Sequence, residues 1–511
     1  MAKYFASLLL FLVVWPSFAA DQNGYTAKYE VRAGNTTDSI TNFDLAAEVT
    51  HACDVTITTA DSAATITSKL TNNQYICVDK GNYASMGTWT IPNSGTSGAR
   101  KVLRYTRSGD TDDEPWNQTS ENQAKILGIT CLNKSYWIFH RLSILPTSGA
   151  RVRFENCDFS IMDRTLIDGT NVNNANGLIL FAGASGPNDQ NTVQNSVIRN
   201  SGKVTNTDVH CINLRGIDNR IVNNEIYNCG GDGIVMDDGG NPFKNKIENN
   251  DIYQTSAYLI GCDGSPGTDC NCGEDGIDLK SNNTTDPSNF ITILHNRFWG
   301  WRTTYETCSG TGSNGFAVNA GALDPKRYVL VQNNIIQDVA NGVALGGPAS
   351  NWSVIGNIFY NIIHGRVPDD GTQNGDGNSI VLRFVGGDNH KAYLNTIIDA
   401  EYGLRIESGG ENNDMRCNLF INIPHIKLNE TATWGAGSKA SNNAFYNTPP
   451  YSTVASSNSI SYPSASDAKG SPYRYFRRLL TNPEQITIPY ARTSNDSPHV
   501  NACTDPLSIP N

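Results

Sequence analysis

The chain has no hydrophobic run after its first 20 residues that is long enough to cross a membrane. It also has no cluster of basic residues, and its 38 lysines and arginines are outnumbered by 49 aspartates and glutamates, which gives a net charge of -11. We therefore expect no nucleic-acid partner and no membrane partner. An acidic surface does not attract a polyanion unaided, so an acidic partner would need a cation to assist its binding.

Residues 1–20 have the pattern of a signal peptide. Lys3 supplies the basic start, Leu8–Val14 the apolar run, and Ser17-Phe18-Ala19 the cleavage site. This pattern predicts a secreted, extracellular protein, and we expect it to be a monomer.

The sequence lacks the two C-x-x-C motifs that are typical of a structural zinc site. Its 12 cysteines are an even number, and in an exported protein they are expected to form disulfide bonds. Cys270 and Cys272 are spaced too tightly to pair easily with each other, so we expect each to bond elsewhere. A zinc site remains the alternative.

Helical periodicity is missing from about residue 136 onward, and a short repeat takes its place. Its first motif is asparagine, any residue, then an apolar residue, and it begins at Asn224, Asn250, Asn296, Asn334, Asn357, Asn395, Asn418 and Asn443. The shorter steps are about two dozen residues, within the period range of solenoid proteins, and the longer steps carry insertions. We interpret these asparagines as a structural ladder.

A second motif follows in each coil: aspartate or asparagine, glycine, and then alternating apolar residues. The clearest copies are Asp232–Met236, Asp275–Leu279, Asn314–Val318 and Asn341–Leu345. Short β-rich segments separated by Asn and Gly turns predict an all-β parallel solenoid, in which stacked coils bury a continuous apolar column.

The repeat also predicts the boundaries of the chain's parts. Residues 21–125 form an N-terminal segment with a cap helix over Ala60–Leu70, begun by Asp61 or Thr59, and with first strands at Tyr75–Tyr83 and Lys101–Tyr105. Residues 126–447 form the solenoid with its cleft, and residues 448–511 form a tail packed along it.

Stacked coils turn sequence columns into spatial neighbours about 4.8 Å apart. The motif alignment predicts one outward column made of Asn213, Val235, Asp278, Ala317, Ala344, Val381 and Arg405. It predicts a second made of Arg215, Asp237, Lys280, Asn319, Gly346, Arg383 and Glu407. Lys280 should therefore lie between Asp237 and Asn319, with Asp278 beside it.

Two insertions, residues 254–272 and 299–313, border the charged part of these columns. Loops rooted on a rigid scaffold beside a polar face are expected to form the wall of a cleft. Within them, Trp299 and Trp301 are candidate platforms for sugar rings, with loop anchors as the alternative. Arg302 is a candidate carboxylate clamp or leaving-group assistant.

An elongated solenoid with a cleft suits a linear polymer, and the charged column suits an acidic one. β-Elimination from a polyuronate needs a group that neutralises the sugar carboxylate and a base that removes the neighbouring proton. Ca²⁺ suits the first task because it prefers oxygen ligands. The candidate ligands are Asp237, Asp238, Glu274, Asp275 and Asp278.

Lys280 is the candidate base, and it can act only when neutral. A bound cation disfavours the charged form of a nearby lysine, whereas free aspartates favour it. We also expect Arg215 and Asn319 to contact the substrate. The competing interpretations are that Asp275 is a turn residue, since that position favours Asn or Asp, and that Lys280 forms an ordinary ion pair across coils.

At these residues the sequence resembles the right-handed β-helix polysaccharide lyases, over about residues 56–447. Glu274, Asp275 and Asp278 match the spacing of the calcium-binding acids of the family-nine pectate lyases, although Ala317 stands where their catalytic lysine is found. Leu279-Lys280-Ser281 is similar to the V-K-S context of the catalytic lysine in family-six alginate lyases, in which an arginine on a later coil assists. The resemblance implies a right-handed parallel β-helix, Ca²⁺ as cofactor and an acidic polysaccharide such as pectate or alginate as substrate.

The leading hypothesis is a Ca²⁺-assisted lyase with Lys280 as base. A polygalacturonase-like hydrolase is the second, since Asn206-Thr207-Asp208 and Asp237-Asp238 resemble its acids, although its Gly-His-Gly and Arg-Ile-Lys elements are absent. A non-catalytic glycan-binding surface protein is the third, and an epimerase acting on the same carbon is a variant of the first.

Overall fold

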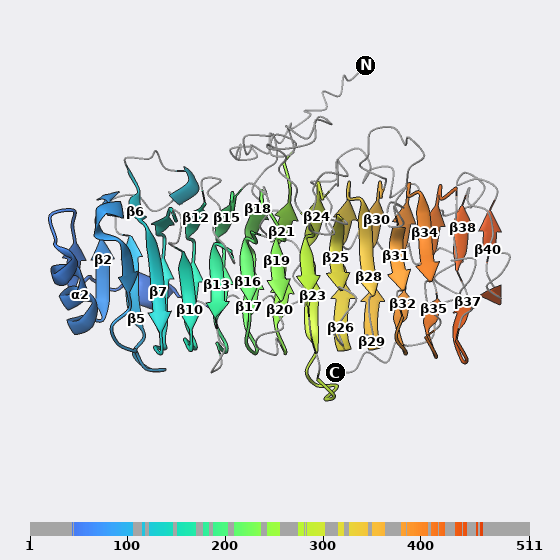
Figure 1. The fold of residues 1–511 in the computed structure, drawn as a ribbon, viewed down its shortest axis with the longest axis horizontal. Helices are drawn as coiled ribbons and strands as arrows, with labels where there is room; N and C mark the ends of the chain where they lie inside the picture. Colours follow the sequence, from blue (N-terminus) through green and yellow to red (C-terminus); the bar gives the residue numbers. More distant parts are fainter. Residues whose placement is uncertain are drawn as a thin grey trace, which may run out of the picture.

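The computed structural model is an elongated right-handed parallel β-helix, with α2 at one end and the last strands at the other (Figure 1). It describes residues 43, 45–105, 115–117, 122–146, 151–169, 177–182, 188–202, 209–236, 243–255, 274–280, 282, 284–301, 315–320, 327–345, 350–362, 380–384, 386–406, 410–416, 418–424, 435–441, 443–446, 456–457 and 460–462. The predicted signal peptide lies outside these residues, as does most of the predicted tail.

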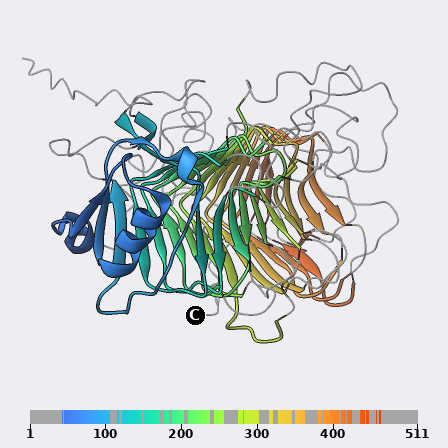
Figure 2. The same cartoon turned by 60° about the vertical axis from the view of Figure 1, so that its left-hand side comes forward.

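Three parallel sheets form the walls of the solenoid, and each turn of the chain between residues 88 and 421 adds one strand to each of them (Figure 2). The 15-stranded sheet contains β1 (Val55–Ile57), β2 (Tyr75–Val78), β5 (Lys101–Tyr105), β8 (Trp137–His140), β11 (Ile161–Asp163), β14 (Thr192–Gln194), β17 (Arg220–Val222), β20 (Lys246–Glu248), β23 (Ile291–Leu294), β26 (Arg327–Gln332), β29 (Ser350–Ile355), β32 (Lys391–Tyr393), β35 (Asp414–Arg416), β37 (Lys439–Ser441) and β39 (Ser456–Ser457).

The 11-stranded sheet contains β4 (Thr88–Thr90), β7 (Gly128–Leu132), β10 (Val152–Glu155), β13 (Ile179–Ala182), β16 (Ile212–Leu214), β19 (Ile234–Met236), β22 (Ile277–Leu279), β25 (Phe316–Ala320), β28 (Asn341–Leu345), β31 (Ile380–Phe384) and β34 (Tyr402–Ile406). The 14-stranded sheet contains β3 (Gly81–Asn82), β6 (Ala124–Ile126), β9 (Ser143–Ile144), β12 (Leu166–Asp168), β15 (Val197–Arg199), β18 (Glu225–Tyr227), β21 (Asp251–Tyr253), β24 (Arg297–Trp299), β27 (Ile335–Gln337), β30 (Ile358–Tyr360), β33 (Thr396–Ile398), β36 (Leu419–Ile421), β38 (Ala444–Tyr446) and β40 (Ile460–Tyr462). Strands β39 and β40 carry the solenoid past residue 447, where we had placed its end.

Helices occupy the N-terminal end, and they are α1 (Ala46–Thr50), α2 (Ala63–Asn72), η1 (Ala84–Met86) and η2 (Pro115–Asn117). Helix α2 confirms the predicted cap helix, but it follows β1 in the chain instead of preceding the first strand. Its N-cap is Ser62, whose hydroxyl accepts the Thr65 N–H at 3.2 Å, and not the predicted Asp61 or Thr59. No helix among the described residues is both long and apolar enough to span a bilayer.

One apolar core runs from Ile57 to Phe445 along the axis of the solenoid. At one corner of the coils from Asn224 to Asn443 the predicted asparagine ladder is present. The backbone N–H of Asn250 donates to Asn296 Oδ1 at 2.8 Å, and its side-chain Nδ2 donates to the Ile221 carbonyl at 2.8 Å. Because each amide satisfies buried backbone groups of its neighbours, the motif fixes a tight corner inside an otherwise apolar interior.

The glycine of the second motif makes room for the aromatic residue of the first. A Cβ at Gly342 would lie 2.3 Å from the Val381 carbonyl oxygen and 3.0 Å from Phe359 Cδ1. Gly276 faces Phe298 and Gly403 faces Phe420 in the same way. In these coils the two motifs are therefore the two sides of one packing contact.

We expect Gly342→Ala to destabilise the protein by roughly 1–3 kcal/mol, because the added methyl group meets backbone on one side and a buried ring on the other. Urea unfolding measures the effect. Gly98→Ala is the matched control, since a Cβ at Gly98 has no atom within 4 Å. Equal unfolding midpoints for the two variants would contradict the packing contact.

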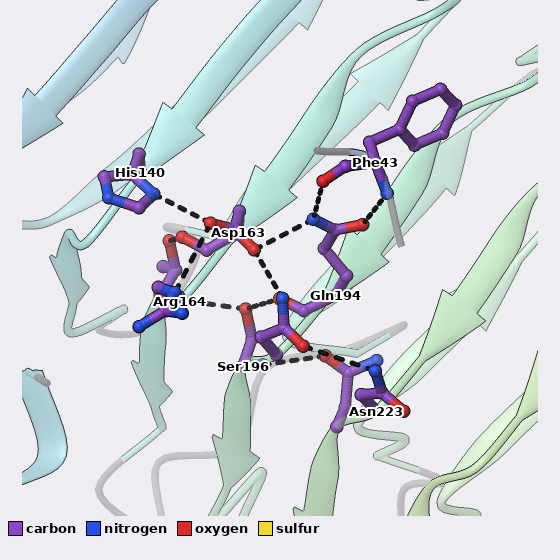
Figure 3. A network of polar contacts seen from close by, with 10 residues as sticks. Phe43, His140, Asp163, Arg164, Gln194, Ser196 and Asn223 are labelled. Atoms are coloured by element: carbon purple, nitrogen blue, oxygen red, sulfur yellow. Dashed lines mark hydrogen bonds and ion pairs between the residues drawn. The ribbon is translucent and has the colours of Figure 1, made fainter. Parts of the chain in front are cut away.

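The N-terminal segment is fastened across the 15-stranded sheet by a polar network (Figure 3). The Gln194 side chain accepts the Phe43 N–H at 3.1 Å and donates to the Phe43 carbonyl at 3.2 Å. Asp163 lies beneath, with its oxygens bonded to His140 at 2.8 Å, to Gln194 at 3.0 Å and to Asn195 at 2.8 Å. Burial raises the pKa of Asp163, but these bonds outweigh it and hold the pKa below its ordinary value.

Three disulfide bonds link neighbouring coils: Cys53–Cys77, Cys131–Cys157 and Cys211–Cys229. They confirm the expected disulfide chemistry for six of the 12 cysteines, and the other six lie outside the described residues. Such bonds are typical of proteins that fold in an oxidising compartment.

Candidate functional site

Three buried aspartates from two consecutive coils meet at the outer face of the 11-stranded sheet. Asp232 precedes β19, Asp275 precedes β22, and Asp278 is the middle residue of β22. One carboxylate oxygen from each lies within 4.8 Å of the others. We call these three residues the acidic cluster. Glu274 adjoins it, and the Lys280 ammonium group forms an ion pair with Asp278.

Asp232 and Asp275 each use one carboxylate oxygen to accept a backbone hydrogen bond at the turn before a strand. Asp232 Oδ1 accepts the Asp275 N–H at 3.1 Å, and Asp275 Oδ1 accepts the Phe316 N–H at 2.6 Å. Asn341 makes the same bond to the Ile380 N–H at 3.0 Å. Asp275 is therefore a turn residue, as the competing interpretation holds. A carboxylate has a second oxygen, however, so this role does not exclude a ligand role.

The second oxygens point to polar neighbours. Asp275 Oδ2 accepts a bond from Asn319 Nδ2 at 2.8 Å, and Asp232 Oδ2 lies 3.1 Å from His210 Nδ1. Asp278 Oδ1 is buried and accepts no hydrogen bond from any residue that the structure describes. A buried carboxylate oxygen without a donor is costly unless a cation or solvent satisfies it, so this atom is the clearest sign of a cation site.

The acidic cluster fits Ca²⁺ by its geometry and its donors. Calcium binds carboxylate oxygens at 2.3–2.6 Å, so two of its ligands are about 5 Å apart or less. The 4.8 Å spread of the three oxygens satisfies this limit. Asp232, Asp275 and Asp278 would hold the ion, and Glu274 adds negative charge beside them.

The electrostatics of the site are dominated by excess carboxylate charge. Burial is the largest cause that raises the pKa of Asp275 well above its ordinary value, and the charges of Asp232, Asp278 and Glu274 raise it further. For Lys280, burial favours the neutral amine, but Asp278, Asp232 and Glu274 outweigh it and raise the lysine pKa above its usual range. Without a cation, Lys280 is therefore held as an ammonium ion.

The raised pKa of Asp275 predicts how stability depends on pH in a chelator. The folded protein keeps a proton that the unfolded chain releases at about pH 4, so stability decreases as pH rises from there through the raised pKa. We expect the unfolding midpoint of the calcium-free protein to fall between mildly acidic and neutral pH. Asp275→Asn, which keeps the acceptor for the Phe316 N–H, should flatten that fall. Parallel pH profiles for the two proteins would contradict this account.

The register of the coils confirms part of the predicted columns and corrects the rest. Asn213 pairs with Val235, and Val235 with Asp278, as predicted. The next partner of Asp278 is Asn319, not Ala317, so Asn319 lies beside Asp278 instead of beside Lys280. In the coil of β25 the turn position is taken by Phe316 and not by Asn314, which shifts the alignment by two residues.

A second shift by two residues, at β31, moves Arg383 into the outward column of Asp278 in place of the predicted Val381. Ala344 pairs with Arg383 and Arg383 with Arg405, so the column continues as Asn319, Ala344, Arg383 and Arg405. Arg383 had been predicted for the column of Lys280.

The two tryptophans contribute to packing and not to an open surface. Trp301 is fully buried, and its indole N–H donates to the Ile252 carbonyl at 3.0 Å. Trp299 lies on the 14-stranded sheet, where it stacks on Tyr253 with ring centroids 4.1 Å apart. Neither ring is exposed enough to support a sugar, so the loop-anchor interpretation describes them better.

Several predicted site residues lie elsewhere or outside the description. Arg215 is half-buried and follows β16, two coils before Lys280. Asp237, Asp238 and Arg302 lie outside the described residues, as do most of the two insertions that were to form the cleft wall. The sequence reasoning missed Asp232 and His210 as site residues, although the Asp-Gly motif that Asp232 shares with Asp275 was visible.

No family model matches this sequence, and no curated protein matches it. Among solved structures, the chain is similar to a mannuronic acid specific family 6 polysaccharide lyase from the human gut microbiota, at 15% identity and a TM-score of 0.43 over 80% of this chain and 83% of that one. It is also similar to the periplasmic alginate epimerase AlgG, at 11% identity and a TM-score of 0.40 over 80% and 84%. A third is PfbA, a surface adhesin of Streptococcus pneumoniae, at 12% identity and a TM-score of 0.41 over 77% and 90%. These proteins differ in activity, and likenesses of this size carry no argument about function.

Proposed function

We propose that the chain is an exported polysaccharide lyase that cleaves a uronate-containing polysaccharide by β-elimination. The observation that supports it most is the ion pair of Lys280 with Asp278, next to a buried carboxylate oxygen that has no donor among the described residues. This arrangement puts a candidate base within one side-chain length of a candidate cation site. β-Elimination requires both at the same sugar.

The acidic cluster would bind calcium, and a calcium ion there would neutralise the sugar carboxylate and the acids around it. Lys280 then loses part of the charge that holds its proton, so its amine becomes available as a base. Its side chain is 38% exposed, which leaves it open to a substrate, whereas Asp278 is 2% exposed. The lysine would take the proton from the carbon next to the carboxylate, a carbon–carbon double bond would form as the bond to the leaving oxygen breaks, and that oxygen would take up a proton from water or from the lysine ammonium group.

Asn319 and His210 have positioning roles in this proposal. Asn319 holds Asp275 Oδ2, and His210 lies against Asp232 Oδ2, so each orients one carboxylate of the acidic cluster. Arg215 remains a proposed substrate contact, and Arg302 remains a proposed carboxylate clamp or leaving-group assistant. We further propose that the protein acts as a monomer and outside the cytoplasm, in keeping with its three disulfide bonds.

An absorbance screen against pectate, polymannuronate and polyguluronate, with and without Ca²⁺, tests the proposal. We expect ultraviolet absorbance from unsaturated uronate ends on at least one polymer, and its loss in a chelator. Reducing ends without absorbance would indicate a hydrolase, and altered sugar stereochemistry without cleavage would indicate an epimerase. Glycan binding without any product would favour a non-catalytic surface protein.

A further inference from the structure

The outward column that contains Asp278 becomes basic farther along the solenoid. After Asp278 and Asn319 it continues through Ala344 to Arg383 and Arg405. With coils about 4.8 Å apart, the Cα atoms of the two arginines lie roughly 14 and 19 Å from that of Asp278. Both arginines are half-buried on the same outer face of the 11-stranded sheet.

The guanidinium group of Arg383 reaches back toward the acidic cluster. Its Cζ lies 6.0 Å from the centre of the Phe316 ring, which belongs to the strand next to Asp278. The backbone N–H of Phe316 is the group that donates to Asp275 Oδ1. A cation over an aromatic face is held in a defined direction, so Phe316 orients this positive charge toward the site.

Along the column of Asp278, the positive charge of Arg383 and Arg405 lies on one side of the acidic cluster. In the opposite direction the column runs through Val235, Asn213 and Leu180 before it reaches Arg153, four coils away, which forms an ion pair with Glu155. Within this column, the arginine nearest to the acidic cluster is therefore Arg383, three coils away, and the arginine on the opposite side is already paired with a carboxylate.

We propose that Arg383 and Arg405 form an anion subsite that binds carboxylates of a uronate chain, two or more sugars away from the unit held at the acidic cluster. This inference rests on the proposed function. A hexose unit is about as long as the distance between two adjacent coils, so successive sugars of the polymer would lie over successive coils. Arginine presents a planar fork that suits carboxylates.

Calorimetric binding of uronate oligomers tests the subsite. The full chain carrying Lys280→Ala, which prevents turnover under the proposed function, is titrated in calcium with mannuronate and galacturonate oligomers of two to six units. We expect Arg383→Gln to weaken hexamer binding about tenfold or more, as loss of a charged hydrogen bond does, and to leave dimer binding unchanged. Arg383→Lys should restore part of the loss, and Arg405→Gln should weaken the longest oligomers only.

Arg416→Gln is the matched control, because Arg416 lies in a neighbouring coil but on the 15-stranded sheet, bonded to Asp414 at 2.9 Å. It should leave hexamer binding unchanged. If folded Arg383→Gln protein binds the hexamer as tightly as the parent protein does, the proposed subsite is wrong. The same conclusion follows if Arg383→Gln weakens dimer and hexamer binding equally, or if no uronate oligomer binds. Failure of the wild-type chain to cleave any polyuronate, with this length dependence intact, would instead reject the proposed lyase activity.

Discussion

Lys280→Ala is expected to lower the rate of uronate elimination by about 10²- to 10⁴-fold, the range in which a general base contributes. The Lys280 side chain is 38% exposed, whereas that of His210, the other nitrogen base beside the acidic cluster, is 8% exposed and lies against Asp232. Steady-state absorbance assays at saturating calcium measure the effect on kcat. KM should change less, because the proposed role is in the chemical step.

Two further variants separate a base from a structural ion pair. Lys280→Arg keeps a positive charge beside Asp278, but a guanidinium stays protonated, so it should preserve stability without restoring activity. Lys246→Ala removes a half-buried lysine from β20, in the preceding coil and on a different sheet, and should leave the rate unchanged. An active Lys280→Arg protein would show that the charge matters and the base does not.

Asp278→Asn is expected to remove most of the stabilisation that the wild-type chain gains from calcium. A ligand at 100 times its Kd adds about 2.7 kcal/mol to the free energy of unfolding when it binds the folded state alone. Three buried carboxylates that repel one another without a cation should make that response large. Urea unfolding in calcium and in a chelator measures it, and activity should fall together with the calcium response.

The control for this variant is another buried aspartate. Asp251 is paired with Arg297 at 2.8 Å on the 14-stranded sheet. Asp251→Asn should destabilise the protein equally in both conditions, because breaking a buried ion pair does not depend on calcium. A full calcium response in Asp278→Asn, or none in the wild-type chain, would contradict the cation site.

The scaffold could be predicted from the sequence because its determinants are local and repeated. The asparagine satisfies backbone groups at one corner, and the glycine accommodates a buried ring such as Phe359, so both motifs recur in many of the coils. Lys280 and the acids of Gly273–Ser281 are close together because they are close in sequence. Their proximity could therefore be predicted without knowing the register of the coils.

The register across coils was harder to predict, and the error at β25 has a physical reason. Strand side chains alternate with a period of two, so a shift by two residues keeps every apolar side chain on the same face. Both alignments of Phe316–Ala320 bury Val318, and the Asn314-Gly315 pair favoured the wrong one. The observed pairing of Asp278 with Asn319 depends on packing along the axis, which the sequence pattern does not specify.

Asp232 was missed because its turn role appeared sufficient. The structure shows that one carboxylate oxygen serves the turn while the other faces His210 and the acidic cluster. The prediction that the tryptophans are sugar platforms was wrong because the sequence does not show whether a ring is exposed. An aromatic residue at a strand end looks the same in sequence whether its ring is open or, like Trp301, packed inside the solenoid.

A crystal structure of the Lys280→Ala protein with calcium and a uronate hexamer tests the central claim most directly. We predict anomalous density 2.3–2.6 Å from oxygens of Asp232, Asp275 and Asp278, bridged to a sugar carboxylate, with the neighbouring C–H directed at the space left by the lysine. Calcium or hexamer bound elsewhere on the solenoid, with the acidic cluster vacant, would contradict the account.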